Sequence, residues 1–406
     1  SMDRSSQLEK VNILSLNGDF DTSFNKGHAL SYGIEGTLNN VRSNAYSQNI
    51  IINGTAIYDL GPKKNIPTRY PSDGSSYKSF AMYVNWTWNM NEFFTFNAGT
   101  RLTYTGLRAK WNELASINAQ LSTFSLNSSA LTSTLSMTLR PSKKFQLMTV
   151  LSSGFRNPNI DDIGKIRENN GILVVPNTFL KPEYAYNLDL GINFKSLNNS
   201  NYMSIRTFAT LISRHIVRSD FIIFSDTTTA DESTILYNGE EVNTIANKNL
   251  GNRFIHGFSI DGFSYFSKSL KFTGSISYVK GDENETYGPM ASISPIFGTI
   301  SGEYSKNKFK VSALYKFSGD KSPGDYSLGG EDGLEETPEI IESNGLIKYA
   351  GTPKWSDFSI YTNYDISQDV KVRFALTNIF DNHYRSFASG ISAPGRSFQI
   401  GLYLKL

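Results

Sequence analysis

The gaps between the strand-like segments of this chain alternate in length, short then long, from one end to the other. The short gaps lie at 25–27, 90–91, 141–143, 198–200, 268–269, 306–307 and 366–368, and the long ones at about 44–76, 107–127, 154–182, 217–251, 281–291, 319–351 and 379–395. Short periplasmic turns and long outer loops are typical of an outer-membrane β-barrel, whereas nothing sorts the turns of a soluble β-sandwich by length. About fifteen segments alternate in this way, so the sequence predicts an all-β, antiparallel transmembrane barrel, with a soluble all-β fold as the alternative.

Apolar residues alternate with polar or small ones along the predicted strands, most clearly along the last one. There Phe398, Ile400 and Leu402 fall on one face while Gln399 and Tyr403 fall on the other, so one face is expected to meet lipid and the other the lumen. Most segments have about 9 to 14 residues, enough to cross the hydrocarbon layer at a barrel tilt. The similar segments are 29–41, 80–88, 93–107, 131–139, 145–151, 184–194, 202–212, 254–266, 270–279, 309–317, 358–364 and 370–376.

The composition agrees with a barrel. Hydrophobic residues make up 39% of the chain and the mean hydropathy is -0.32, which excludes a helical membrane protein but suits strands whose alternate residues face a polar lumen. No run of 18 apolar residues occurs, so no membrane-spanning helix is predicted. The 22 Tyr and 27 Phe would suit two interfacial girdles, although they would equally suit ordinary packing in a sandwich core.

Several functional classes are disfavoured by the residue types. Cysteine is absent, which excludes disulfides, thiolate metal sites and cysteine nucleophiles, and a net charge of +2 gives no reason to expect a nucleic-acid partner. No HExxH, GxSxG, P-loop or glycine-rich fingerprint is present. His256 and Asp261, five residues apart along a strand, point to opposite faces. We therefore predict no catalytic residues, metal site or cofactor, and no enzymatic activity.

The strand count is odd, whereas a bacterial single-chain barrel closes with an even number of strands. The first strand, near residues 9–23, leads into a short turn, so its own beginning is expected to lie outside the cell. Ser1 and Met2 look like a cloning scar, and no signal peptide precedes the first strand. We therefore expect a fragment, from which earlier strands of the barrel are missing.

Two stretches resemble the paired motifs of TonB-dependent outer-membrane receptors, in which an Arg-containing turn precedes an LKPE sequence at the start of a strand. These are GFRNPNIDDIG at 154–164 and NTFLKPEYAYNLDLGINF at 177–194. The ending of the chain, 351–406, is similar to the last three strands of that family, with NIFDNHYR at 378–385 and APGRSF at 393–398 around the final outer loop. The opening at 9–36 is similar to a mid-barrel hairpin of such receptors.

The resemblance implies a 22-stranded barrel with a plugged lumen. Residues 1–406 would supply about its last fifteen strands, while the signal peptide, the plug domain and the energy-coupling segment would be absent. It further implies an outer-membrane receptor that imports a scarce nutrient, with an iron–siderophore complex as the expected ligand. The expected partners are the lipid bilayer and a TonB-type energy-coupling complex, which would act through the missing N-terminal part. Leu406 departs from the family, whose members usually end in Phe or Trp.

The ligand is not fixed by the sequence. Haem receptors of the family generally carry a His between the two motifs, but residues 157–180 contain none, which disfavours haem. The acidic loop at 319–351 would not attract an anionic chelate; it favours cationic or neutral ligands, or is simply a solvated loop. Arg156, in the first motif, is a candidate ligand-binding residue, and Trp111 is another because its ring could stack on a sugar. Both could instead serve the barrel itself, and a passive porin or a surface adhesin remains the alternative function.

Overall fold

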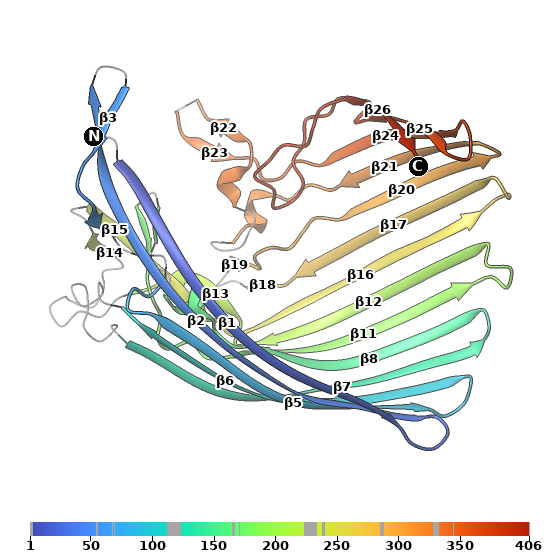
Figure 1. The fold of residues 1–406 in the computed structure, drawn as a ribbon, viewed down its shortest axis with the longest axis horizontal. Coiled ribbons are helices and arrows are strands. Elements are labelled where there is room, and N and C mark those ends of the chain that lie inside the picture. The colour runs from blue at the N-terminus through green and yellow to red at the C-terminus, as the bar shows by residue number, and fades with distance from the viewer. Residues whose placement is uncertain are drawn as a thin grey trace.

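One large antiparallel sheet dominates the protein (Figure 1). The computed structural model describes residues 3–53, 56–66, 68, 70–111, 123–164, 167–169, 171–222, 234–237, 240–284, 288–327, 333–343 and 345–405. Within these ranges the sheet has 17 strands, two of which, β3 (Ala56–Leu60) and β4 (Lys64–Asn65), only extend the pairing of β2. The other fifteen are β1 (Asp3–Ser23), β2 (His28–Asn53), β5 (Ser75–Asn89), β6 (Phe94–Lys110), β7 (Thr123–Ser142), β8 (Phe145–Arg156), β11 (Glu183–Lys195), β12 (Asn201–Ser213), β16 (Asn252–Tyr265), β17 (Leu270–Gly281), β20 (Phe297–Lys306), β21 (Phe309–Ser318), β24 (Trp355–Asp365), β25 (Val370–Thr377) and β26 (Ser397–Leu404).

Each of these fifteen strands pairs with the next in antiparallel fashion, from β1 to β26. The predicted fold class and the predicted alternation of short and long gaps are therefore confirmed. Figure 1 shows the short hairpin turns together on one side of the sheet and the longer connections on the other. At the first turn Gly27 has a φ of 91°, and a Cβ there would lie 2.4 Å from the carbonyl oxygen of Asn89, so glycine is required.

The long connections carry small elements of their own. Two neighbouring connections, before β11 and before β16, share a second sheet in the order β13-β15-β10-β9, with β14 beside β15 and with β10 parallel to β15. The described elements of all the long connections are α1 (Ile160–Gly164), β9 (Arg167–Asn169), β10 (Ile172–Val174), β13 (Ile216–Asp220), β14 (Thr234–Tyr237), β15 (Glu240–Asn249), β18 (Glu283–Asn284), β19 (Gly288–Pro289), η3 (Pro323–Asp325), η4 (Leu334–Glu336), β22 (Glu339–Ile341) and β23 (Ile347–Tyr349). None of the helices described is long and apolar enough to cross a membrane.

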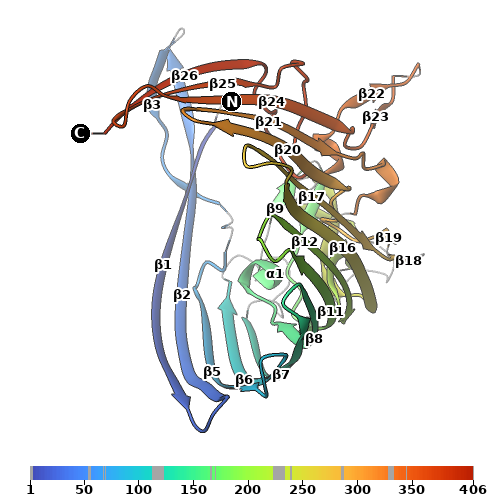
Figure 2. The ribbon, with the colours of Figure 1, turned by 90° about the vertical axis from the view of Figure 1, so that its right-hand side faces the viewer.

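The two faces of the large sheet differ as the alternation predicts. The sheet is curved, and α1 lies on its concave side (Figure 2). Along β5, Phe80, Met82 and Val84 are exposed on the convex face, whereas Tyr83 points inward and its hydroxyl donates a hydrogen bond to Asp19. On the same inner face the guanidinium of Arg101 forms two hydrogen bonds, of 3.0 and 2.6 Å, with the carboxylate of Glu35. The convex face is therefore the lipid-facing one, and the concave face is the polar wall of the lumen.

An aromatic girdle marks the lipid-facing side near the short turns. The ring of His28 stacks on Trp86 and Trp88 at centroid distances of 5.7 and 5.6 Å, and Phe24 stacks on His28 at 5.8 Å. The indole N–H of Trp86 donates to Nδ1 of His28 over 3.2 Å. Such amphipathic rings are suited to the head-group level of a bilayer, so this cluster fits an interfacial girdle at this end of the strands.

Several strands are longer than predicted. β2 has 26 residues where the sequence indicated 29–41, and β7 has 20 residues where it indicated 131–139. The extra residues continue the strand pairing beyond the apolar band. Their apolar side chains no longer keep to the lipid-facing side, since Ala45 of β2 and Phe124 of β7 are buried on the inner face. The alternation expected of a lipid-facing strand therefore ends while the backbone pairing continues, and the pattern could not show this continuation. The predicted segments did not include β20; only the short gap at 306–307 indicated that a strand ends there.

The sheet has two open edges in the part of the chain that is described. No pairing joins β1 to β26 there, so the fifteen strands form an incomplete ring (Figure 2). Leu406, the residue that departs from the family's usual ending, lies outside the described residues.

Candidate ligand-binding mouth of the barrel

Two of the long connections fold onto the concave face at its outer end, where the lumen opens. The first runs from the end of β8 to the start of β11 and contains α1. The second runs from β25 to β26. Both pack against inward-facing residues of the sheet, so they form the rim of its concave face at this end.

The first connection is anchored by an apolar cluster. Ile163 of α1 is 1% exposed and packs with Val41, Leu107 and Trp111, which point inward from β2, from β6 and from just beyond β6. Ile160, Phe124, Ala109, Leu180 and Ile216 complete this cluster. Trp111 is 2% exposed, so its ring packs in this core and not on an open surface. Its position does not favour the predicted stacking on a sugar, and its role in ligand binding stays a prediction.

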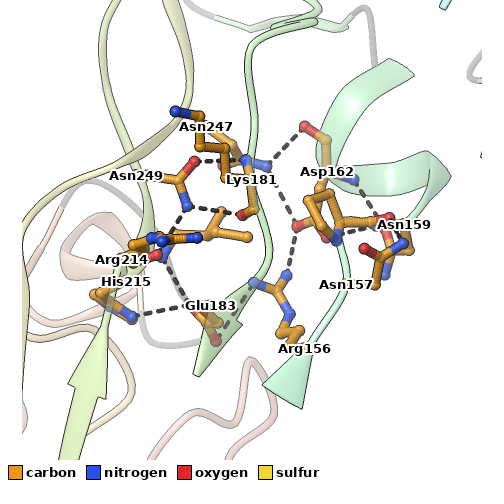
Figure 3. Close-up of polar contacts among 12 residues, drawn as sticks. Arg156, Asn157, Asn159, Asp162, Lys181, Glu183, Arg214, His215, Asn247 and Asn249 are labelled. Atoms are coloured by element: carbon orange, nitrogen blue, oxygen red, sulfur yellow. Dashed lines mark hydrogen bonds and ion pairs between the residues drawn. The ribbon is translucent and has the colours of Figure 1, made fainter. Parts of the chain in front are cut away.

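A chain of charged contacts joins the two sequence motifs (Figure 3). Arg156, at the end of β8, forms an ion pair with Asp162 of α1 at 2.5 Å and lies 3.8 Å from Glu183, the first residue of β11. Glu183 also lies 3.4 Å from Nδ1 of His215, and it accepts a hydrogen bond from the backbone N–H of Ile216 at 2.7 Å. The Arg-containing turn and the LKPE strand start are thus one polar network.

Asparagine side chains complete the network from the neighbouring connection (Figure 3). Asn247 donates to the backbone carbonyl of Asp162 at 3.0 Å. Asn249 donates to the carbonyls of Lys181 and Arg214 at 2.9 and 2.8 Å, and its own side-chain oxygen accepts from the N–H of Lys181 at 2.7 Å. These bonds satisfy backbone groups that no strand pairs, and they fix the two connections to each other.

Arg156 is therefore committed to a positioning role in this arrangement. Its side chain is 43% exposed, but two carboxylates already neutralise its charge. Its predicted contact with a ligand remains a prediction. His215, Asn247 and Asn249 were not found by sequence reasoning, because they belong to a connection more than 30 residues further along the chain. Their only sequence signal is the NKN triplet at 247–249, which is too common to be specific.

The second inward connection is fixed to β24. Tyr384 stacks on Trp355 at a centroid distance of 4.2 Å and donates a hydrogen bond of 3.3 Å to the carboxylate of Asp357. Burial and the charge of Asp357 raise the pKa of the Tyr384 phenol, so it stays protonated as a donor. Asn378 donates from its side-chain amide to the carbonyls of Asn382 and Pro394 at 2.9 and 3.1 Å. The NIFDNHYR and APGRSF motifs thus hold the final loop against the wall.

A cavity of about 360 Å³ lies between this final loop and the connection before β24. Its aromatic wall is formed by Tyr326, Trp355 and Tyr384, and its cationic side chains are Lys354 and Arg385. Arg385 donates from one terminal nitrogen to the carbonyl of Glu336 at 2.8 Å, which leaves further donors of its guanidinium fork. The buried indole nitrogen of Trp355 has no hydrogen-bond partner in the described part of the chain. The cavity therefore offers aromatic surface and hydrogen-bond donors of positive charge.

The four histidines do not come together. His28 and His256 lie on the lipid-facing side, His215 lies in the Arg156 network, and Nε2 of His383 lies 3.0 Å from the hydroxyl of Ser392. His256 and Asp261 lie on opposite faces of β16, as the sequence predicts. Within the described ranges no three His, Asp or Glu side chains are placed to hold a metal ion.

The connection before β24 carries carboxylates on its exposed surface. Glu335, Glu336, Glu339 and Glu342 are exposed to varying degrees, and Glu342 forms an ion pair of 2.6 Å with Lys348. Glu331 and Asp332, which contributed to the acidic character noted in the sequence, lie outside the described residues. The acidic surface borders the cavity, and Glu336 itself lines the cavity beside the aromatic and basic side chains.

Comparison with known protein families identifies one to which most of the chain matches. Residues 2–379 match the family model described as TonB dependent receptor-like, beta-barrel. A search of curated proteins found no match. Among solved structures the fold is similar to the copper transporter OprC, with a TM-score of 0.72, 14% identity, and coverage of 98% of this chain and 57% of that one.

Two further similar structures are receptors for other cargo. The ferric-catecholate import receptor Fiu from E. coli K12 has a TM-score of 0.61 at 14% identity, with coverage of 98% of this chain and 55% of that one. The siderophore receptor PiuA from Acinetobacter baumannii has a TM-score of 0.63 at 12% identity, with coverage of 99% and 56%. At such identities the likeness shows the fold alone, and the chain spans a little over half the length of these proteins.

The match extends over nearly the whole chain and agrees with the fifteen paired strands, the lipid-facing convex face and the inward motifs. The family is one of outer-membrane transporters and not of enzymes, which confirms the predicted location and fold class. The chain belongs to the TonB-dependent receptor-like β-barrel family.

Proposed function

We propose that the whole protein binds a scarce nutrient at the outer mouth of its barrel and imports it with energy from a TonB-type complex. Family membership over residues 2–379 carries this proposal. The plug domain and the energy-coupling segment that this mechanism requires would belong to the part of the protein outside this sequence. A polar concave wall with pairs such as Arg101 and Glu35 is suited to contact with a plug.

We propose an iron–siderophore complex as the nutrient. Siderophore chelates are commonly anionic and often aromatic, and the cavity at the final loop presents Trp355 and Tyr384 beside Lys354 and Arg385. Fiu and PiuA, which share the fold, are described as a ferric-catecholate import receptor and a siderophore receptor. The copper transporter OprC shares the fold as well, so the support for this ligand class comes from the cavity and not from the fold.

The test uses the full-length receptor and a ferric catecholate as the probe. Replacing Arg385 with Gln removes a charged donor from the cavity, and a charge-assisted hydrogen bond contributes about 1.5–3 kcal/mol. We expect the dissociation constant of the probe to rise by roughly tenfold or more. The matched control is Arg396→Gln, an exposed arginine near β26 that does not line the cavity.

Three results would contradict the proposal. Equal affinities of the wild type and Arg385→Gln for the probe would show that the cavity is not part of the binding site. Import of copper or haem without any binding of the ferric probe would overturn the ligand class. Uptake that continues after the membrane is de-energised would indicate a passive pore.

A further inference from the structure

Basic side chains gather on the lipid-facing side of the sheet, in the outer halves of the first strands. Lys10 of β1, Arg42 of β2, Lys78 of β5, and Arg108 and Lys110 of β6 are all exposed there. The strand register places them side by side. Lys10 pairs with Arg42, and Asn40 pairs with Ser76, which in turn pairs with Arg108. We call these five residues the basic rim.

The charges of the basic rim are hardly compensated. Lys110 forms an ion pair of 2.5 Å with Asp73. The amine of Lys78 lies 5.8 Å from the ring centre of Tyr104, over its face. In the described part of the chain no carboxylate pairs with Lys10, Arg42, Lys78 or Arg108. Like charges held this close repel one another, so the arrangement favours an anionic partner.

A hollow and a groove lie at the rim. The hollow, of about 890 Å³, is lined by Lys10, Arg42, Arg108 and Lys110 together with Asn40 and Ser76. The groove, of about 330 Å³, lies on the membrane side of the hollow, since its residues occupy the next rows of the same strands. It is apolar, and Leu14, Leu16, Leu38, Phe80 and Tyr104 line it. A cationic hollow beside an apolar groove matches the two ends of an acidic amphiphile.

The depth of the rim agrees with the outer membrane surface. Trp88 belongs to the inner aromatic girdle, and Lys78 lies ten residues before it in β5. At about 3.4 Å per residue this distance is roughly 34 Å along the strand. At a tilt of about 40° it becomes roughly 26 Å along the membrane normal, close to the apolar band of about 25 Å in such barrels. The basic rim therefore lies at the outer head-group level.

We propose that the basic rim binds an anionic, phosphate-bearing lipid of the outer leaflet. The phosphate would accept hydrogen bonds from Lys10, Arg42 and Arg108 in the hollow. An acyl chain would lie in the groove between Leu14, Leu38 and Phe80. A free inorganic phosphate could use the hollow but would leave the apolar groove unused, which is why a lipid is the better fit. This site faces away from the lumen and does not depend on the proposed transport function.

The experiment measures lipid bound to the full-length receptor. The test variant combines Lys10→Gln, Arg42→Gln and Arg108→Gln. The control variant combines Lys316→Gln, Arg206→Gln and Arg373→Gln, which remove the same charge from the concave face. Both are incorporated into nanodiscs of neutral lipid, and binding of added phosphatidic acid is followed by native mass spectrometry. Folding is checked by the shift in electrophoretic mobility on heating.

A basic residue at an anionic lipid surface contributes roughly a fivefold factor in binding, so three together predict a fall of about 100-fold in affinity for phosphatidic acid. The control variant should bind like the wild type, and millimolar inorganic phosphate should not displace the lipid. Unchanged binding in the test variant, an equal loss in the control, or full displacement by inorganic phosphate would each overturn the proposal. If the triple variant does not fold, the salt dependence of phosphatidic acid binding to the wild type tests the proposal instead. Affinity should fall as salt is added, and an affinity that does not fall would exclude a role for the basic rim.

Discussion

Replacing Ile163 with Ala should release α1 from the barrel wall. α1 has only five residues, so it has no stability of its own and depends on the apolar cluster and on the Arg156 network. The side chain of Ile163 is 1% exposed and packs with Leu107 and Trp111. Truncating a buried Ile to Ala costs about 2–5 kcal/mol. At about 1.4 kcal/mol per factor of ten, the population of the undocked state should rise by roughly 30-fold to 3,000-fold.

Amide hydrogen exchange of the full-length receptor measures this change directly. The backbone N–H of Ile163 donates to the carbonyl of Asn159 at 3.2 Å, so it is protected only while α1 is formed. Peptides covering 157–164 should therefore exchange faster by that factor in the variant. Ile391, which is 81% exposed, provides the control, because Ile391→Ala removes the same atoms without opening a cavity. Unchanged protection in Ile163→Ala would refute the assigned docking of α1.

Three other substitutions test separate parts of the structure. Glu183→Gln removes the carboxylate that faces Arg156 and His215, at a cost of about 1–3 kcal/mol, so trypsin should cleave the chain faster after Arg214. The control Glu303→Gln, in a surface pair with Lys310, should leave that cleavage rate unchanged. Equal cleavage rates in the two variants would disprove the role of Glu183. The raised pKa of Tyr384 means that its contribution to docking the final loop is complete below about pH 10 and is lost as the pH rises through the raised value. Exchange of 378–385, normalised to free peptide, should therefore increase above that pH in the wild type, and a similar increase in Tyr384→Phe would contradict this account. Ile400→Arg places a charge on the lipid-facing side at a cost of about 2–4 kcal/mol and should reduce the yield of heat-modifiable barrel. Gln399→Arg, on the lumen side, should leave that yield unchanged. A lower yield for Gln399→Arg than for Ile400→Arg would show that the two faces are assigned wrongly.

The fold followed from the sequence because each strand of a barrel reports its two faces locally. The alternation of Phe398, Ile400 and Leu402 with Gln399 and Tyr403 needs no tertiary information. Turn length is equally local, which is why the pairing order from β1 to β26 agreed with prediction. Strand lengths were underestimated where pairing continues outside the apolar band, since apolar residues there, such as the buried Phe124, leave the lipid-facing side and interrupt the periodic signal.

The site was predicted less completely. The two motifs around Arg156 and Glu183 were visible as motifs, but their partners His215, Asn247 and Asn249 come from another connection. Contacts between two irregular connections depend on the positions of the strands that carry them, and no sequence periodicity encodes that. Trp111 was proposed as a ring that could stack on a sugar, whereas it packs in the apolar cluster with Ile163 of α1.

Uptake of ⁵⁵Fe supplied as a ferric catecholate is the most direct test of the proposed receptor. It would be measured in cells that express the full-length protein, with the TonB-type complex intact and with it deleted. We expect uptake that saturates with ligand, stops when the complex is deleted and returns when the complex is restored. Uptake that is unaffected by the deletion would contradict the central proposal and leave a barrel that conducts its solute passively.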